Sequence, residues 1–395
     1  MVNDSSNSAP PGPVAAPGRP ADGRAPEPAR ERSVHAAGAP PTRPAPPAAW
    51  WGGLLATDVE EVVDLAEDPG ALERDGWWFV VLDFEAPVGE PSAVSADARG
   101  RARAWRFGRV RPAAPPDGGS WVGPDVEGWT SSADRATYTA GVGLVRELVR
   151  AGVVYQANLC RVLEAPLPPG VDPWALAARL REGNEAPYSG VLDLGDEGFV
   201  VPASPELFLR RRGDVVESGP IKGTAAPGGP LGPKDVAENV MITDLVRNDL
   251  QRACRPGTVE VVSLLAREAH PGLDHLVSTV RGRLRPGTTW ADLLRATFPP
   301  ASVSGAPKRA ALDALAALEA VPRGPYCGGV GWVDVRRGAA ELAVGIRTFA
   351  ASGGVLRFGT GAGITWGSDP QGEWEETELK AARLLRLASR APGAP

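Results

Sequence analysis

The sequence contains few of the residues that build disulfide frameworks, zinc sites and membrane spans. Its 395 residues include three cysteines, three histidines and two methionines. Cys160, Cys254 and Cys327 form no close pair and no metal-ligand spacing, so we expect three small core residues in a reducing cytoplasm. No run approaches the roughly 18 apolar residues of a membrane-spanning helix. Asn3 and Asp4 are soon followed by prolines, which does not resemble a secretory signal. We therefore expect a cytoplasmic protein without a membrane association.

The excess of negative over positive charge is also small. The formal net charge is −6, and no long basic run occurs in the part expected to fold. Proteins that bind nucleic acids usually carry a basic patch, so this balance argues against nucleic acid as the main partner. The hydrophobic fraction of 43% is enough for a substantial core, and the length allows one large or two ordinary domains.

Composition divides the chain into three parts. Residues 1–47 are mostly alanine, proline, glycine, serine and scattered charges. Such a segment cannot bury enough apolar surface to offset the entropy of ordering, so we expect a disordered tail. Residues 48–130 contain strand-like runs at 77–84 and 105–110 before a Pro/Gly-rich stretch, and we expect a divergent N-terminal part of the same fold. Residues 131–391 carry the remaining predicted elements.

Hydrophobic periodicity predicts helices and strands without regular βαβ alternation. Helices are expected from the N-cap candidates at 131–134 up to 151, and over 172–181, 234–250, 290–297, 309–320 and 373–389. Strands are expected over 153–162, 191–194, 199–202, 207–209, 259–265, 275–282, 328–335, 341–350 and 356–358. Adjacent strands with single helices between them favour an α+β class with mainly antiparallel sheets.

One lysine stands in an unusual backbone setting. Lys222 follows Pro220 and Ile221 and precedes Gly223. Pro220 fixes its own φ and favours an extended residue before it, whereas Gly223 permits a sharp bend or the close approach of another group. A lysine buried in such a stiff segment loses proton affinity, and its neutral amine is a nucleophile. A turn with a solvated lysine is the alternative.

Two pairs of carboxylates occur at helical spacing. Asp235 and Glu238 lie near the start of one predicted helix, and Glu373 and Glu376 near the start of another. A spacing of three places both side chains of a pair on one face. If the two helix starts face each other, the carboxylates need a cation, and oxygen ligands without clustered histidine or cysteine select Mg²⁺ over Zn²⁺. Interaction of these acids with the helix dipole is the structural alternative.

An anion site is indicated near the C-terminal strands. Arg347 lies in an apolar strand, and the glycine-rich segment 359–363 can present backbone N–H groups to a carboxylate. A structural ion pair of the arginine and a tight turn at the glycines are the alternatives. Nucleotide binding is not favoured, because no helix follows the glycines at once and no suitable acid stands about twenty residues further on.

Taken together, these segments resemble the chorismate-utilising enzymes, and within them component I of aminodeoxychorismate synthase. The resemblance covers roughly residues 135–390, with many separate motifs in the same order. The motifs are segments 155–159, 204–206, 220–224, 237–239, 244–250, 275–279, 304–308, 323–328, 346–348, 361–363 and 368–377. The resemblance implies an antiparallel β-sandwich core with helices packed outside, in which residues 131–391 are the chorismate-binding catalytic region.

The resemblance also implies a reaction. Ammonia is expected to aminate chorismate at C4 and give 4-amino-4-deoxychorismate, the precursor of p-aminobenzoate in folate biosynthesis. Lys222 is expected to attack C2 and form a covalent intermediate while Glu206 protonates the departing hydroxyl group. His275 is expected to orient groups near the ring, with a purely structural role as the alternative.

Two binding sites are implied with it. Mg²⁺ is expected to hold the C1 carboxylate, directly through Glu238 and Glu376 and through water on Asp235 and Glu373. The second carboxylate is expected to be bound by Arg347, Tyr326, Lys380 and the backbone at Gly361, Ala362 and Gly363.

Two positions separate the members of this family. Anthranilate synthases typically carry a small residue where this chain has Lys222, and isochorismate and salicylate synthases carry a lysine base where it has Gln156. A neutral amide does not take up a proton near pH 7, so ammonia is favoured over water as the nucleophile. Anthranilate synthase component I, and enzymes of the isochorismate or aminodeoxyisochorismate synthase type, remain the alternatives.

The source of ammonia is expected to lie on another chain. A glutaminase needs a nucleophilic cysteine paired with a histidine. The part expected to fold has only His270 and His275, and no cysteine at a strand-to-helix elbow. We therefore expect a separate glutamine amidotransferase subunit.

Overall fold

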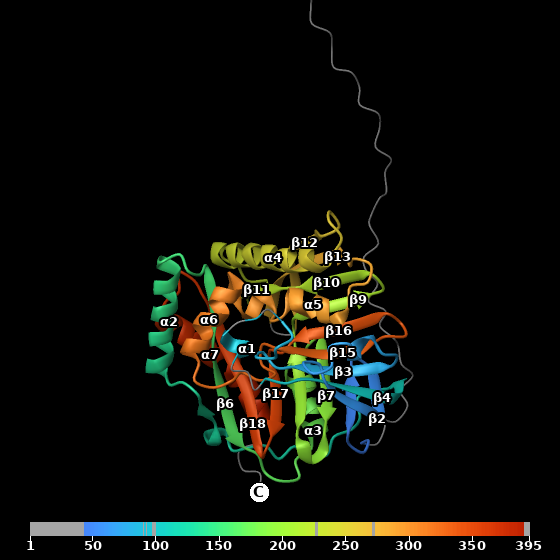
Figure 1. The fold of residues 1–395 in the computed structure, drawn as a ribbon. Coiled ribbons are helices and arrows are strands. Elements are labelled where there is room, and N and C mark those ends of the chain that lie inside the picture. Colours follow the sequence, from blue (N-terminus) through green and yellow to red (C-terminus); the bar gives the residue numbers. More distant parts are fainter. Residues whose placement is uncertain are drawn as a thin grey trace, which may run out of the picture. The chain divides into compact units, whose positions relative to one another are not determined.

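Two connected runs of antiparallel strands form the framework of the protein (Figure 1). The computed structural model describes residues 43–89, 91, 93–96, 100–225, 228–270 and 273–390. The expected disordered tail therefore lies outside the described residues up to position 42.

The strands have the following bounds: β1 (Ala48–Trp51), β2 (Leu54–Asp64), β3 (Trp77–Leu82), β4 (Ala102–Pro112), β5 (Thr130–Ser131), β6 (Gln156–Pro166), β7 (Tyr188–Asp193), β8 (Phe199–Ser204), β9 (Leu207–Arg212), β10 (Val215–Gly219), β11 (Ile221–Ala225), β12 (Glu260–His270), β13 (Leu273–Arg283), β14 (Gly305–Ala306), β15 (Gly329–Asp334), β16 (Ala339–Val344), β17 (Thr348–Ser352) and β18 (Val355–Ile364). The helices are α1 (Ala93–Ala96), α2 (Arg135–Arg150), α3 (Pro173–Gly183), α4 (Pro233–Ala253), α5 (Trp290–Thr297), α6 (Lys308–Leu318) and α7 (Pro370–Ala388).

The first run has the strand order β2-β4-β3-β15-β16-β9-β10-β13-β12, and β11 pairs with β13 beyond the end of β10. The second run has the order β1-β7-β8-β17-β18-β6, and the short strands β5 and β14 also pair with β6. Strand β1 pairs with β2 as well, which connects the two runs. Each of these pairings is antiparallel.

An aromatic core lies between the two runs. It contains Trp51, Trp77 and Phe79 together with Leu192 and Val200, which come from strands of both runs. The rings of Trp51 and Phe79 meet edge to face with centroids 6.0 Å apart. All six residues of β3 are buried, because its other face packs against a second cluster under the helices. This burial on both faces explains why β3 is a continuous apolar run and does not alternate.

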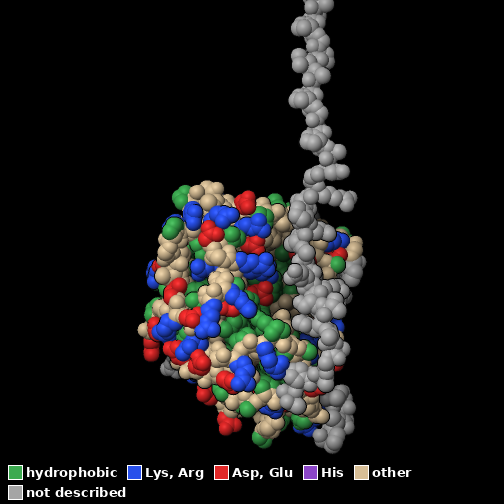
Figure 2. Space-filling view, turned by 90° about the vertical axis from the view of Figure 1, so that its right-hand side faces the viewer, with side chains coloured by type: hydrophobic (Ala, Val, Ile, Leu, Met, Phe, Trp, Pro, Cys, Tyr) green, Lys and Arg blue, Asp and Glu red, His purple; other side chains and the backbone are tan. Residues whose placement is uncertain are grey.

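Helices cover the outer faces of both runs. Helices α4 and α5 lie over the first run at the top of Figure 1, and α3 and α7 pack on the second run. Helices α2 and α6 pack against β6 and β18. The expected α+β class, with antiparallel sheets packed as a sandwich and helices outside, is confirmed. Among the described residues no helix is long and apolar enough to cross a bilayer. On the face seen in Figure 2, basic, acidic and apolar side chains are interspersed.

Two strand predictions near the site are wrong. The strand expected over 341–350 is divided into β16 and β17, because the backbone turns at 345–347, where Arg347 has a φ of 51°. The strand expected over 356–358 continues through the glycines to Ile364, where it pairs with β6. A glycine-rich stretch usually indicates a loop, but here pairing with a long neighbouring strand holds it extended.

Candidate active site

A β-bulge sets the direction of Lys222. Strand β11 pairs with β13 through Ile221 and Thr224, and the register shifts between these two residues. Gly223 has a φ of 86°, and a Cβ atom placed on it would lie 2.8 Å from Cβ of Asp235 on α4. The sharp bend and close approach expected at Gly223 are thus present. Bulges of this kind re-aim side chains next to functional sites.

Lys222 is partly buried in strand β11, and its amine lies among charged side chains. Burial is the main cause that lowers its pKa, and the nearby Lys380 lowers it further. The carboxylates of Glu238, Glu206 and Glu376 act in the opposite direction. The structure therefore brings four of the predicted site residues into the electrostatic range of one amine. The solvated-turn alternative for this lysine is not what the structure has.

Glu206 is the most deeply buried of these acids. It follows β8, is 4% exposed, and its backbone N–H donates to the hydroxyl oxygen of Ser204 at 3.2 Å. Burial raises its pKa to about 7, against the opposing effects of the Ser302 hydroxyl, Lys222 and the backbone N–H of Ile221. A carboxyl group with this pKa is partly protonated near neutral pH, which suits a general acid.

The carboxylate pairs on α4 and α7 differ in their surroundings. Asp235 Oδ2 accepts a hydrogen bond from the backbone N–H of Gly232 at 2.8 Å, so this acid caps its own helix. Glu376 Oε1 lies 2.6 Å from Nζ of Lys380, and Glu373 is 4% exposed. Glu238 and Glu376 are both within electrostatic range of the Lys222 amine, on which they act in the same direction.

The fit of these residues to Mg²⁺ follows from their number and chemistry. Among the described residues, no group of three or more His, Cys, Asp or Glu side chains is arranged to hold a metal ion. The four carboxylates therefore do not form a ready-made cage. Mg²⁺ usually takes only one or two carboxylates and keeps several waters, so the pair of Glu238 and Glu376 has the donor set that it needs.

Arg347 has no carboxylate partner among the residues that the structure describes. It lies between β16 and β17 and is partly buried. Over the described ranges its guanidinium makes no ion pair and no hydrogen bond, and burial lowers its pKa with no opposing acid. The structural ion pair that was the alternative is therefore absent from this part of the chain. A half-buried arginine with free donors suits an anionic ligand.

The glycines of β18 allow close packing around this region. Strand β17 pairs only with residues 355–358, so further along one edge of β18 has no partner strand among the described residues. A Cβ atom on Gly359 would lie 2.0 Å from the ring of Tyr326, and one on Gly363 would lie 2.5 Å from the amide nitrogen of Gln156. The carbonyl oxygen of Gly361 accepts a hydrogen bond from Nζ of Lys380 at 3.0 Å. The tight-turn alternative is wrong, since these residues are in a strand.

His275 and the cysteines are all buried. His275 is 2% exposed on β13, where its backbone pairs with that of Thr224, two residues after Lys222. Cys160, Cys254 and Cys327 are buried free thiols, as expected of small core residues.

Three further polar residues belong to this region although the sequence did not single them out as site residues. Gln156 is fully buried, and neither atom of its amide makes a hydrogen bond among the described residues. The Ser302 hydroxyl also meets no partner at full hydrogen-bond geometry among these residues, although it lowers the pKa of the neighbouring Glu206. Arg323, in the motif that contains Tyr326, is 3% exposed and donates to the carbonyl oxygens of Val303 and Asn158 at 2.9 and 2.6 Å. The position of Arg323 in a shared motif was the only signal for it, whereas Gln156 is also one of the two positions that separate the related enzymes.

Several curated proteins are similar to this chain in sequence. Anthranilate synthase component 1 of Streptomyces coelicolor is 38% identical over 68% of this chain and 54% of its own length. Aminodeoxychorismate synthase of Streptomyces griseus is 39% identical over 66% of this chain and 37% of its own length. Aminodeoxychorismate synthase component 1 of Klebsiella aerogenes is 34% identical over 78% of this chain and 68% of its own length. The chain thus spans between 37% and 68% of the length of these relatives.

Solved structures share the fold. Anthranilate synthase component I from Streptococcus pneumoniae superposes with a TM-score of 0.70 at 22% identity, covering 90% of this chain and 96% of the other. The menaquinone-specific isochorismate synthase from Escherichia coli gives 0.68 at 20% identity, covering 89% and 90%. The family profile described as chorismate binding enzyme matches residues 94–386, which include every predicted site residue. With that match over most of the chain and the fold just described, the protein belongs to the chorismate binding enzymes.

Proposed function

We propose that this protein aminates chorismate at C4 with ammonia and releases 4-amino-4-deoxychorismate. The observation that carries the proposal is the setting of Lys222, a lysine of lowered pKa beside Glu206, Glu238 and Glu376. A neutral amine next to a protonated acid is the pair that nucleophilic displacement of a hydroxyl group needs. We also propose that the reaction takes place in the cytoplasm, where the buried free thiols would stay reduced.

The reaction proceeds in two displacements. The amine of Lys222 attacks C2 of chorismate, both ring double bonds shift by one position so that new ones form at C1=C6 and C4=C5, and the C4–O bond breaks as Glu206 gives its proton to the departing hydroxyl group, which leaves as water. Ammonia then forms a bond to C4, both double bonds shift back to C1=C2 and C5=C6, and the bond from C2 to Lys222 breaks. The proton that ammonia loses returns to Glu206, so the enzyme is regenerated. Gln156, whose amide lies beside Gly363 and makes no hydrogen bond to any described residue, is available to orient the incoming ammonia.

Each of the two carboxylates of chorismate has its own binding site in this proposal. Mg²⁺, when bound, neutralises the C1 carboxylate; Glu238 and Glu376 are its direct ligands in this proposal, while Asp235 and Glu373 act through water. Arg347 and Tyr326, with Lys380 and the backbone of Gly361, Ala362 and Gly363, bind the second carboxylate. His275, on the strand next to Lys222, orients groups near the ring.

Ammonia comes from a second protein in this proposal. The Klebsiella aerogenes relative is named as a component 1, which supports a separate glutamine amidotransferase subunit as partner. The product would then feed p-aminobenzoate and folate biosynthesis.

Anthranilate synthase component 1 is the second candidate, because a relative of that name is 38% identical, close to the 39% of an aminodeoxychorismate synthase. Lys222 favours the first function, since an enzyme that releases anthranilate needs no covalent amine at this position.

The deciding experiment is an incubation with chorismate, Mg²⁺ and ammonium chloride, followed by mass spectrometry and fluorescence. We expect a product that retains the enolpyruvyl group and no fluorescent anthranilate. Without ammonium, intact-protein mass should increase by chorismate less one water in the wild type but not in Lys222→Ala. Lys222→Arg is the matched control, because it keeps the charge but is never neutral. Anthranilate as the product, or full amination by Lys222→Ala, would refute the proposal.

A further inference from the structure

Ser302 carries a buried hydroxyl group that meets no partner at full hydrogen-bond geometry within the described part of the chain, although it lies close enough to Glu206 to lower the pKa of that carboxyl group. The residue is 3% exposed and lies in a short 3-10 turn, Ala301–Val303, between α5 and β14. Leaving a buried hydroxyl unpaired is destabilising, so an unpaired one in a native protein requires an explanation.

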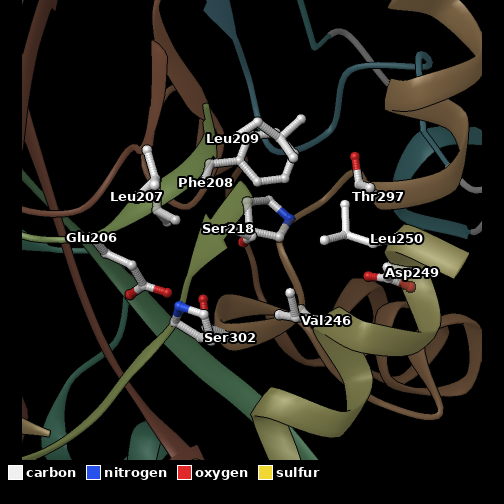
Figure 3. A pocket seen from close by; sticks show the side chains of 14 residues that line it. Glu206, Leu207, Phe208, Leu209, Ser218, Val246, Asp249, Leu250, Thr297 and Ser302 are labelled. Atoms are coloured by element: carbon white, nitrogen blue, oxygen red, sulfur yellow. The ribbon is translucent and has the colours of Figure 1, made fainter. Parts of the chain in front are cut away.

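The hydroxyl lies beside the carboxyl group of Glu206 (Figure 3). Both residues line a small cavity of about 10 Å³, which has room for roughly one water molecule. Two other polar residues on its wall already have partners: Asp249 is paired with Lys308 at 2.7 Å, and Thr297 donates to the carbonyl oxygen of Leu293 at 2.8 Å. Of the two carboxyl groups that line the cavity, that of Glu206 is the one beside the Ser302 hydroxyl and the one whose pKa the hydroxyl lowers.

A rigid network holds the turn that carries Ser302. Arg323 donates to the carbonyl oxygen of Val303 and to that of Asn158 on β6. The backbone N–H of Asn158 in turn donates to the carbonyl oxygen of Ser304 at 2.9 Å. The side chain of Arg323 is fully buried and paired with Glu319 at 2.7 Å. The position of the hydroxyl is thus set by the strand that begins at Gln156.

We propose that Ser302 is a positioning residue for the proton of Glu206: its hydroxyl donates to one carboxyl oxygen and leaves the proton on the other, which faces the reacting centre. The inference rests on the proposed role of Glu206 as general acid. As the proton departs, charge develops on the carboxyl group, and a hydrogen bond to that group becomes stronger. The hydroxyl thereby stabilises the transition state more than the resting enzyme.

Other charged and polar groups near Glu206 also affect its pKa. Lys222 and the backbone N–H of Ile221 act on it from β11, and Asp249 with Lys308 lies across the cavity. Ser302, Lys222 and Ile221 all lower the pKa of Glu206 against the larger effect of burial. Removing the Ser302 hydroxyl group alone should therefore raise the pKa of Glu206.

The test is an infrared titration of the full chain without substrate or metal. The carboxylic-acid C=O band of Glu206 is assigned by its loss in Glu206→Gln. Ser302→Ala should move the midpoint of this band to higher pH, and Ser302→Cys, with a weaker donor of similar size, should move it the same way. Ser304→Ala is the matched control, since it removes a buried hydroxyl that donates to the carbonyl oxygen of Pro300 at 3.0 Å.

In turnover with chorismate, Mg²⁺ and ammonium, Ser302→Ala should lower kcat by about 10- to 100-fold, as expected for one hydrogen bond to a developing charge, with KM for chorismate nearly unchanged. An unmoved midpoint in both Ser302 variants, or an equal shift in Ser304→Ala, would overturn the inference. Because the titration needs no substrate, a shift would support it even if the wild type fails to aminate chorismate. If the wild type aminates chorismate but the midpoint of Glu206 does not move in the Ser302 variants, the inference about Ser302 is refuted and the proposed function stands.

Discussion

The amine of Lys222 lies against Gly363, a residue 141 positions later in the chain. A Cβ atom on Gly363 would stand 3.3 Å from Nζ of Lys222 and 2.5 Å from Nε2 of Gln156. Because Gly363 has no side chain, the amine of Lys222 and the amide of Gln156 can occupy the space next to its backbone. Three strands, β6, β11 and β18, therefore contribute to one small volume.

Replacing Gly363 by alanine should displace the Lys222 amine and the Gln156 amide at once. We expect Gly363→Ala to lower kcat/KM for chorismate by about 100-fold, because a misplacement of about 1 Å at a reacting group has that effect. The unfolding free energy should change little, since the nearest atoms belong to side-chain ends that can move. Gly367→Ala is the control, because a Cβ atom there meets nothing within 4 Å. Wild-type kinetics in Gly363→Ala would show that this contact has no role.

Arg347→Gln should separate binding from stability. We expect KM for chorismate to increase by about 10- to 100-fold, as for the loss of a charge-assisted hydrogen bond to a carboxylate. The midpoint of urea unfolding should stay the same or rise, because the variant removes a half-buried charge that has no acidic partner among the described residues. Arg357→Gln, which breaks a surface pair with Glu164, is the control and should leave KM unchanged. A large loss of stability in Arg347→Gln would instead indicate a structural arginine.

Magnesium dependence should report on the two glutamates. Glu238→Gln and Glu376→Gln should each raise the Mg²⁺ concentration for half-maximal activity by at least about 10-fold, since an amide is a weaker ligand for a hard cation. Calorimetric titration with Mg²⁺ in the presence of chorismate gives the same quantity without turnover. Glu375→Gln is the control, because that exposed side chain bonds Gln371 instead. Equal Mg²⁺ affinities in all three variants would exclude the pair as ligands.

The pH profile should reflect Glu206 and Lys222 together. Glu206 must be protonated to act as an acid, and its pKa of about 7 predicts that kcat/KM falls as pH rises above about 7. Lys222 must be neutral, so the rate should also fall toward low pH. The two groups are neighbours, so the apparent pKa values belong to the pair. Total ammonium should be adjusted to keep free ammonia constant; a rate that still climbs through pH 9 would contradict the role of Glu206.

Local signals in the sequence were reliable where the chain itself imposes the structure. The helix expected to start after 131–134 begins at Arg135, with Asp134 accepting a hydrogen bond from the backbone of Thr137. The helix over 290–297 has the expected bounds. Gly223 bends as its residue type allows. Capping and backbone freedom act over a few residues, so neighbouring positions contain the information.

Signals that depend on distant partners were misread or missed. The run of glycines in β18 is extended because β6 pairs along its whole length, and β2 was not predicted at all. The helix-capping contact of Asp235 is present, whereas its expected action on Mg²⁺ through water stays a prediction. Ser302 and Arg323 gained significance only when the turn and the strand β6 came together.

From the sequence alone follow the α+β class, the family, and the residue types that the chemistry requires, because these depend on periodicity and on motifs within short segments. Only the tertiary structure decided that Lys222 meets Gly363 and Gln156, that Arg347 has no acidic partner in the described residues, and that the Ser302 hydroxyl is left beside Glu206. Burial and electrostatics depend on which distant segments pack together, and that packing sets the pKa of each group in the site.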